Sequence, residues 1–258
     1  MSSLRRPWRS RTLGIVLATT AFATAATAGL PSENQCPTYS GLSGVGPAED
    51  AVPTRVLEHL ARGVAGDVPE TPGPGDPVFV RVRHDVIASN ADARRAAVAA
   101  AEGQGLRGID LGEVLVGEAR GQARSLVDRA RAQRGAGPVC LVAGGETTVT
   151  LTGGGRGGRS QELALAVATL LAEGGDHDIA VLAAGTDGTD GPTDAAGAYL
   201  DSGTLERGSA EGVDAKAALA ANGSYDFFAQ EGGLVITGPT RTNVMDLVLI
   251  EVSAESPR

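Results

Sequence analysis

Two uninterrupted apolar runs constrain the fold of this chain most strongly. VCLVAGG (139–145) and IAVLAAG (179–185) each end in glycine and lead into a polar loop. Apolar runs of this length are typical of strands in a sheet that is covered by helices. Between them, QELALAVATLLAEGG (161–175) has the periodicity of an amphipathic helix. The sequence therefore predicts an α/β protein.

The segment upstream continues this alternation. VFVRVRHDVIAS (78–89) predicts a strand, and ADARRAAVAAAEGQG (91–105) predicts a helix that ends at glycine. A weak strand over 106–116 and a helix over 117–133 follow, an order that favours a parallel sheet. The remaining expected elements are short helices at 56–61, 203–208 and 214–221, a strand over TTVTLT (147–152), and two strands within 232–252.

Composition excludes several classes of protein. The chain has 258 residues, of which 42% are hydrophobic, so it is long enough to bury a core. Aromatic residues make up only 3% and the net charge is −9, and both values argue against nucleic-acid binding. The two cysteines lie far apart in the chain and support neither a disulfide framework nor a zinc site. No GxSxG motif is present for serine hydrolysis.

The first 32 residues differ from the rest of the chain. They contain no Asp or Glu, and four arginines precede TLGIVLATTAFATAATAG. This pattern predicts a secretory signal peptide, although its apolar centre is too short and too rich in Thr for a stable membrane span. A frame-slipped or truncated start that never belonged to the fold is the alternative.

The first of three polar loops that follow apolar strands contains GGETT. We expect Gly144, Gly145, Glu146 and Thr147 to contact a substrate or nucleotide, because glycine backbone approaches an anion closely. GGGRGGR follows but lacks the GK[ST] ending of a phosphate-binding P-loop. Arg159 stands at the start of the next helix, where both its guanidinium and the helix N-terminus favour an anion.

The other two loops supply acidic and hydroxyl groups. Asp187, Asp190 and Asp194 lie within AGTDGTDGPTDAAGA, at a spacing suited to Mg²⁺ or to substrate hydroxyls. A turn-rich loop in which these aspartates only cap backbone groups is the alternative. In TGPTRTNV, Thr240 and Asn243 are the candidate donors, with Thr242 beside them. Loops at the carboxyl ends of strands are where α/β sheets bind ligands.

The order of these motifs resembles a known family. GGETTVTLTGGGRGGRSQE, AAGTDGTDGPTDAAGA, SYDFF and VITGPTRTNVMDL resemble the C-terminal MOFRL domain of the glycerate 2-kinase family, whose members are often labelled hydroxypyruvate reductase. ETPGPGDPVF, VIASNADARRAAVAAA and LGEVLVGEAR resemble the end of its N-terminal Rossmann-like domain. The resemblance implies a MOFRL-type α/β domain at 136–253, a partial Rossmann-like α/β domain at 48–135, and an atypical N-terminus at 1–47.

The resemblance also implies an activity. Family enzymes transfer the γ-phosphoryl group of ATP to the 2-hydroxyl of D-glycerate with Mg²⁺, in a cleft between two domains. Arg159 matches the family arginine that stabilises the transferring phosphoryl group, and Asp187 is the candidate Mg²⁺ ligand. Glu146, Asp190 and Asn243 would line the same cleft. The partners implied are a small-molecule substrate and a nucleotide, with no nucleic acid and no stable membrane association.

Two departures from the family pattern leave alternatives open. Family members are much longer, and a catalytic lysine of their N-terminal domain has no counterpart here, since Lys216 is the only lysine. We therefore favour a truncated, cytoplasmic chain of impaired activity over an exported protein. A non-catalytic binding domain for glycerate-like acids or nucleotide is one alternative, and an NAD(P)H-dependent hydroxypyruvate reductase is another. The oligomeric state stays open between a monomer and a homo-oligomer.

Overall fold

The computed structural model describes residues 53–254, which belong to two compact units. One unit contains the described residues up to Ile87, and the other begins at Ala88. The signal-like segment and the predicted boundary at residues 47/48 lie outside the described residues. The predicted boundary at 135/136 falls within the second unit, and the three-part division of the chain stays a prediction.

Within its described residues 53–87, the unit that ends at Ile87 contains one helix and one helical turn. Helix α2 (Thr54–Val64) confirms the predicted short helix, and none of its residues is buried. The predicted strand over 78–89 is wrong, because Pro77–Phe79 form the 3-10 turn η2 instead. Asp76 caps this turn by accepting a hydrogen bond from the Val78 amide at 2.9 Å. A proline after a capping aspartate favours a helical start, and an extended segment forms a strand only where another strand pairs with it.

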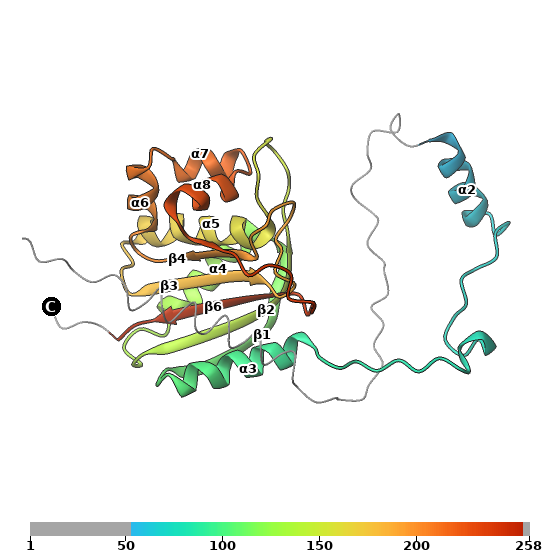
Figure 1. Cartoon of the computed structure of the whole chain (residues 1–258), viewed down its shortest axis with the longest axis horizontal. Helices are drawn as coiled ribbons and strands as arrows, with labels where there is room; N and C mark the ends of the chain where they lie inside the picture. The colour runs from blue at the N-terminus through green and yellow to red at the C-terminus, as the bar shows by residue number, and fades with distance from the viewer. Residues whose placement is uncertain (1–52, 255–258) are drawn as a thin grey trace, which may run out of the picture. The chain divides into compact units, whose positions relative to one another are not determined.

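The unit that begins at Ala88 alternates helices and strands (Figure 1). Its helices match the predicted ones closely, except that α8 was not predicted. The predicted strand over 147–152 is wrong, because these residues form the end of β2 and the loop that follows it. Strand β4 was not predicted either. The elements are α3 (Asn90–Gly103), β1 (Arg107–Glu118), α4 (Ala119–Arg131), β2 (Val139–Thr148), α5 (Arg159–Gly174), β3 (Ile179–Gly185), β4 (Gly197–Leu200), α6 (Thr204–Ala210), α7 (Ala215–Ala220), α8 (Ser224–Glu231), β5 (Leu234–Val235) and β6 (Asp246–Val252).

The strands form a six-stranded sheet in the order β1-β2-β6-β3-β4-β5. Only β1 and β2 pair in parallel, while all other neighbours are antiparallel. The predicted α/β class is confirmed, but the predicted parallel sheet is wrong, because apolar periodicity reports burial and not strand direction. As a consequence, the first residue of β6 lies at the carboxyl ends of two neighbours: Asp246 pairs with Gly145 of β2 and with Gly185 of β3.

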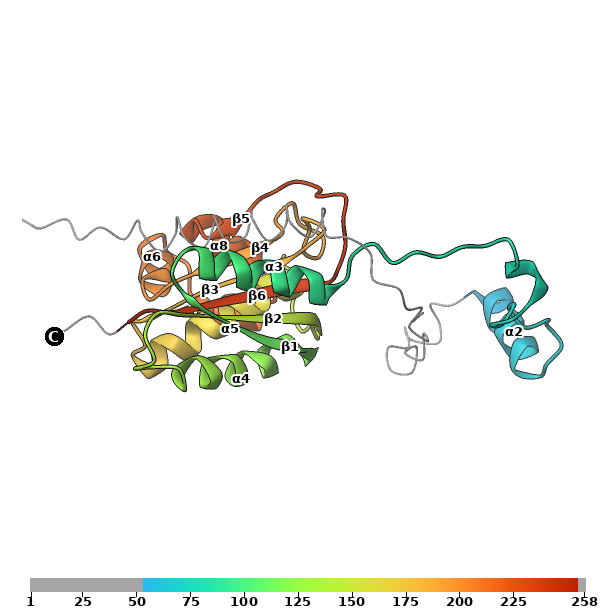
Figure 2. The same cartoon turned by 90° about the horizontal axis from the view of Figure 1, so that it is seen from below.

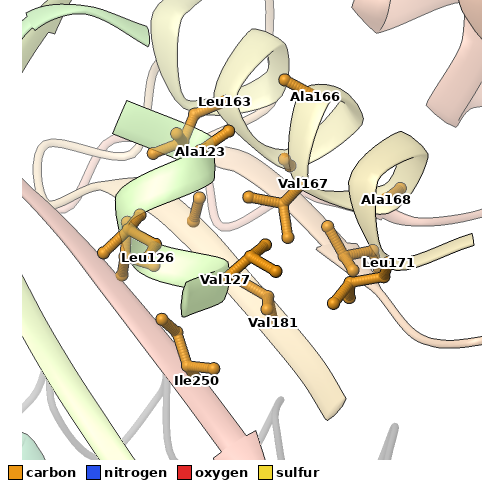
Figure 3. Packing of buried hydrophobic residues seen from close by; sticks show 14 of the residues in the cluster. Ala123, Leu126, Val127, Leu163, Ala166, Val167, Ala168, Leu171, Val181 and Ile250 are labelled. Carbon is orange, nitrogen blue, oxygen red and sulfur yellow. The ribbon is translucent and has the colours of Figure 1, made fainter. Parts of the chain in front are cut away.

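Helices cover both faces of this sheet (Figure 2). On one face α4 and α5 pack against the sheet through apolar side chains such as Leu126 and Val167, which share a cluster with Ile250 of β6 (Figure 3). On the other face α3 packs against β1 and β2, and its Ala93 and Ala97 are fully buried. The small alanine side chains let α3 lie close to the strands. The two layers hold the carboxyl ends of β2 and β3 in fixed positions.

Candidate functional site

Arg159 is held between two carboxylates at the sheet edge where β2, β3 and β6 meet. It is the first residue of α5, and its Nε and Nη2 donate to Asp246 Oδ2 and Oδ1 at 2.6 and 3.0 Å. Its Nη1 lies 2.7 Å from Oε1 of Glu146, on β2. The hydrogen bonds to Asp246 raise the pKa of Arg159 above its ordinary value, so the guanidinium stays charged.

Asp246 is the site residue that the sequence interpretation missed. Its side chain is 4% exposed, whereas that of Glu146 is 52% exposed. Burial raises the pKa of Asp246, and the hydrogen bonds and charge of Arg159 oppose this shift. Its position inside the apolar run VMDLVLI gives no indication of a charged contact. Only the antiparallel placement of β6 brings it to Arg159.

The second and third polar loops are joined beside this pair. The Thr240 amide donates to the carbonyl of Asp187 at 3.0 Å, and Asn243 Nδ2 lies 3.4 Å from Asp187 Oδ2. The Thr240 hydroxyl also donates to the Thr186 carbonyl at 2.5 Å. A Cβ atom added to Gly185 would lie 3.2 Å from Asp187 Oδ1 and 3.4 Å from an oxygen of Asp246. The structure therefore brings Asp187 and Asn243 to the same edge as Arg159.

Asp190 points inward and caps helix α5. Its two oxygens accept hydrogen bonds from the amides of Ser160 at 3.0 Å and Gln161 at 2.8 Å. Burial raises the pKa of Asp190 to about 6. The sequence interpretation offered this helix N-terminus to a bound anion, but Asp190 occupies it instead. A Cβ atom on Gly158 would overlap the Asp190 side chain, which explains the glycine just before α5.

The other predicted residues are more dispersed. Asp194 accepts a hydrogen bond from the hydroxyl of Tyr225 at 2.7 Å, away from Arg159. Gly144 and Gly145 lie inside the β2–β6 ladder. A Cβ atom on Gly144 would overlap the Asn90 side chain, and Gly145 has φ +127 with the Leu115 carbonyl close by. These two glycines are therefore explained by packing.

A cavity of about 590 Å³ lies beside Arg159. Glu146, Thr147 and Arg159 line one part of it, and the glycine run that precedes α5 lines another. Asp187 and Asn243 are not among its lining residues. The glycine run is not a free hairpin, because Asn222 Oδ1 accepts from the amides of Thr152 and Gly153 at 2.7 and 2.9 Å.

The carboxylates suit one mode of magnesium binding. No group of three or more His, Cys, Asp or Glu side chains able to hold a metal ion occurs among residues 53–254. Mg²⁺ that is bound together with substrate phosphates needs only one or two protein carboxylates. Asp187 fits that mode, because the hydrogen bonds that its carboxylate accepts from described residues are few: one from the Thr189 amide at 3.0 Å and a longer one from Asn243 Nδ2 at 3.4 Å. Within the same described range, no helix is long and apolar enough to cross a membrane.

Comparisons with known proteins agree with the motifs at this edge. The MOFRL family model matches residues 139–246, which include Glu146, Arg159, Asp187 and Asp246. The chain is 38% identical to the glycerate 2-kinase of Pyrococcus horikoshii over 215 residues, which cover 81% of this chain and 48% of that protein. The chain belongs to the glycerate 2-kinase family.

Further relatives support this assignment. Human glycerate kinase is 52% identical over 121 residues, which cover 45% of this chain and 23% of that protein. The crystal structure of glycerate kinase from Thermotoga maritima superposes with a TM-score of 0.61 at 32% identity, over 77% of this chain and 49% of that chain. The chain thus spans about half the length of the Pyrococcus horikoshii and Thermotoga maritima proteins.

Proposed function

We propose that this chain acts as a glycerate 2-kinase, in which ATP phosphorylates D-glycerate to 2-phosphoglycerate. The observation that carries the proposal is the Arg159 guanidinium, which Asp246 fixes at the sheet edge beside Asp187. Phosphoryl transfer depends on positioning and on neutralising negative charge more than on covalent chemistry. A permanently charged guanidinium in a fixed orientation supplies both.

The proposal gives each residue a distinct part. Arg159 stabilises the phosphoryl group during transfer, and Asp246 orients Arg159. Asp187 is the residue that would hold Mg²⁺, whose charge would neutralise the phosphates of ATP. Asn243 and Thr240 hold the Asp187 loop in place. These assignments require a phosphoryl oxygen to replace Glu146 as the partner of Arg159 Nη1. The Glu146 side chain is about half-exposed and can therefore move away.

The remaining predicted ligands act indirectly in this proposal. The Asp190 carboxylate fixes the second loop to α5 and thereby helps to orient Arg159. Thr147 lines the cavity beside Glu146, Gly144 and Gly145 position β2 through close packing, and Asp194 holds Tyr225. Because ATP is the donor, we also propose a cytoplasmic location.

A binding module without turnover is the second candidate. It is favoured by the cavity of about 590 Å³ beside Arg159, whose lining residues do not include Asp187 or Asn243. The reductase alternative has less support, because the Pyrococcus horikoshii and human relatives are named kinases and because the glycine run GGGRGG (153–158), although it fits the spacing GxGxxG, does not directly follow a strand.

One assay separates these candidates. The purified chain is incubated with ATP, Mg²⁺ and D-glycerate, alone and with the separately produced N-terminal half of the Pyrococcus horikoshii glycerate 2-kinase, and 2-phosphoglycerate is measured. The proposal expects product in at least one arm. ATP binding without product in either arm supports the binding module. Oxidation of NAD(P)H by hydroxypyruvate supports the reductase.

A further inference from the structure

The floor of the cavity beside Arg159 carries a compensated negative charge. Glu162 is 1% exposed, and its Oε1 accepts hydrogen bonds from Arg120 Nε at 2.6 Å and from Asn222 Nδ2 at 3.1 Å. Arg120 is fixed in turn by a hydrogen bond of 2.6 Å to the carbonyl of Leu219. The floor therefore presents a carboxylate whose charge is already neutralised.

The two ends of the cavity differ in their chemistry. Arg159 and Glu162 are three residues apart on α5, so they lie on the same face of the helix, one turn from each other. The end at Arg159 attracts phosphate groups when Nη1 of Arg159 turns from the exposed Glu146 to a ligand. The end at Glu162 attracts them less, because Arg120 already balances the Glu162 charge, but the carboxylate accepts hydrogen bonds from hydroxyl or amino groups. A ligand with a charged end and a neutral, hydroxyl-bearing end would bind in one orientation only.

The walls between these ends are apolar. Val149, Leu151 and Pro192 line the cavity together with the glycine backbone. Leu151 is 78% exposed, so much of the surface of this lining residue is open to a ligand. The volume of about 590 Å³ lies inside the range of roughly 300–1,000 Å³ that is typical of sites for drug-sized ligands. A small acid such as glycerate would leave most of it unfilled.

We propose that this cavity binds the nucleoside of the phosphoryl donor. The base packs against Leu151 and Pro192, the ribose hydroxyls donate toward Glu162, and the phosphates extend toward Arg159. This assignment rests on the proposed kinase function for the identity of the donor as ATP. The argument for a nucleoside in the cavity comes from its apolar wall, its volume and its polarity.

Gly154 offers a clean test of this site. A Cβ atom there would meet no atom within 4 Å, and its φ lies outside the left-handed region, so a larger side chain causes no strain. A Cβ atom on Gly153 or Gly155, by contrast, would come within 2.6 Å of the Ala221 backbone. Gly154→Leu therefore fills space at the cavity without disturbing the docked loop. Gly121→Leu is the matched control, because Gly121 also has no neighbour within 4 Å and lies on the exposed side of α4.

Titration calorimetry of the full chain with ATP, adenosine and inorganic tripolyphosphate provides the measurement. The wild-type chain and Gly121→Leu should bind ATP more tightly than tripolyphosphate. Gly154→Leu should weaken binding of ATP and of adenosine by about tenfold and leave tripolyphosphate affinity and thermal stability unchanged.

Two other results overturn the proposal. Equal ATP affinity in Gly154→Leu and the wild type, or tripolyphosphate bound as tightly as ATP, rejects the nucleoside site and leaves the proposed kinase function standing. Cavity-dependent ATP binding without any 2-phosphoglycerate formation rejects the kinase function and leaves the nucleoside site standing. Absence of all binding rejects both.

Discussion

Replacing Asp246 by Asn tests whether one buried carboxylate sets the geometry of the site. The Asp246 side chain is 4% exposed and accepts two hydrogen bonds from Arg159, whose side chain is 32% exposed. Asn keeps the shape of Asp but removes the charge and one of the two acceptors. Complete loss of a partner in a buried ion pair costs about 3–5 kcal/mol, and one hydrogen bond to a charged group contributes about 1.5–3 kcal/mol. Since one acceptor remains, we expect a loss of about 2 kcal/mol in unfolding free energy.

Thermal and denaturant unfolding measure this loss directly. In a domain of this size, about 2 kcal/mol lowers the melting temperature by roughly 4–8 °C. Phosphoryl transfer should fall further, by about 10²–10³-fold, because a misoriented Arg159 no longer stabilises the developing charge. Activity measured well below the melting temperature separates this effect from unfolding.

Asp226→Asn is the matched control. Asp226 pairs with Arg156 at 2.8 Å, but both side chains are about half-exposed or more, so the pair contributes only about 0–1 kcal/mol. A melting temperature and turnover equal to those of the wild type in Asp246→Asn would refute the reasoning. Equal losses in the two variants would refute it as well.

Three further changes follow from the same geometry. Gly158→Ala should lower the unfolding free energy by about 1–3 kcal/mol, because its Cβ atom would overlap Asp190. The control Gly121→Ala in α4 should raise the unfolding free energy by about 0.5–1 kcal/mol, and denaturant unfolding compares the two variants. Burial raises the pKa of Asp190 from 3.8 to about 6, so the folded state binds a proton more tightly than the unfolded chain, and stability falls as the pH rises from about 4 to about 6. Asp190→Asn should flatten that part of the stability profile, and an unchanged slope would contradict the assigned burial. Glu146→Gln removes the negative charge that holds Nη1 of Arg159 and should tighten tripolyphosphate binding by roughly 1.5- to 5-fold in calorimetry. Weaker binding would show that Glu146 is not a competitor.

Local sequence patterns predicted most of the helices and the apolar strands β2 and β3, but they missed α8 and the buried strand β4. The alanines of α3 and the leucines of α5 repeat at helical spacing, and β2 and β3 are continuous apolar runs, so each segment carries its own signal. The segment 78–89 shows the limit of this approach. Its β-branched residues favour an extended backbone, but whether that backbone joins a sheet depends on a partner strand elsewhere in the chain.

The sequence indicated candidate site residues only where the residue type itself suggests a chemical role. Arg159, at the start of a helix, and Asp187, in a polar loop, are of this kind, and the structure places both at the same end of the sheet beside Asp246. Asp190 stands in the same kind of loop, but its carboxylate turns inward to cap a helix, an outcome set by tertiary packing. Asp246 was missed because strand direction decides its neighbours, and strand direction leaves no trace in hydrophobic periodicity.

The central claim is that Arg159, held by Asp246, presents a charged N–H group to a phosphate at the sheet edge. Tripolyphosphate affinity of the wild-type chain and of Arg159→Lys tests it most directly. A guanidinium reaches Asp246 through Nε and Nη2 while Nη1, which contacts the exposed Glu146, stays available for a phosphate, whereas a lysine has a single ammonium that Asp246 would hold. The account predicts binding by the wild type and a loss of about tenfold or more in Arg159→Lys. Equal affinity in the two proteins would contradict it.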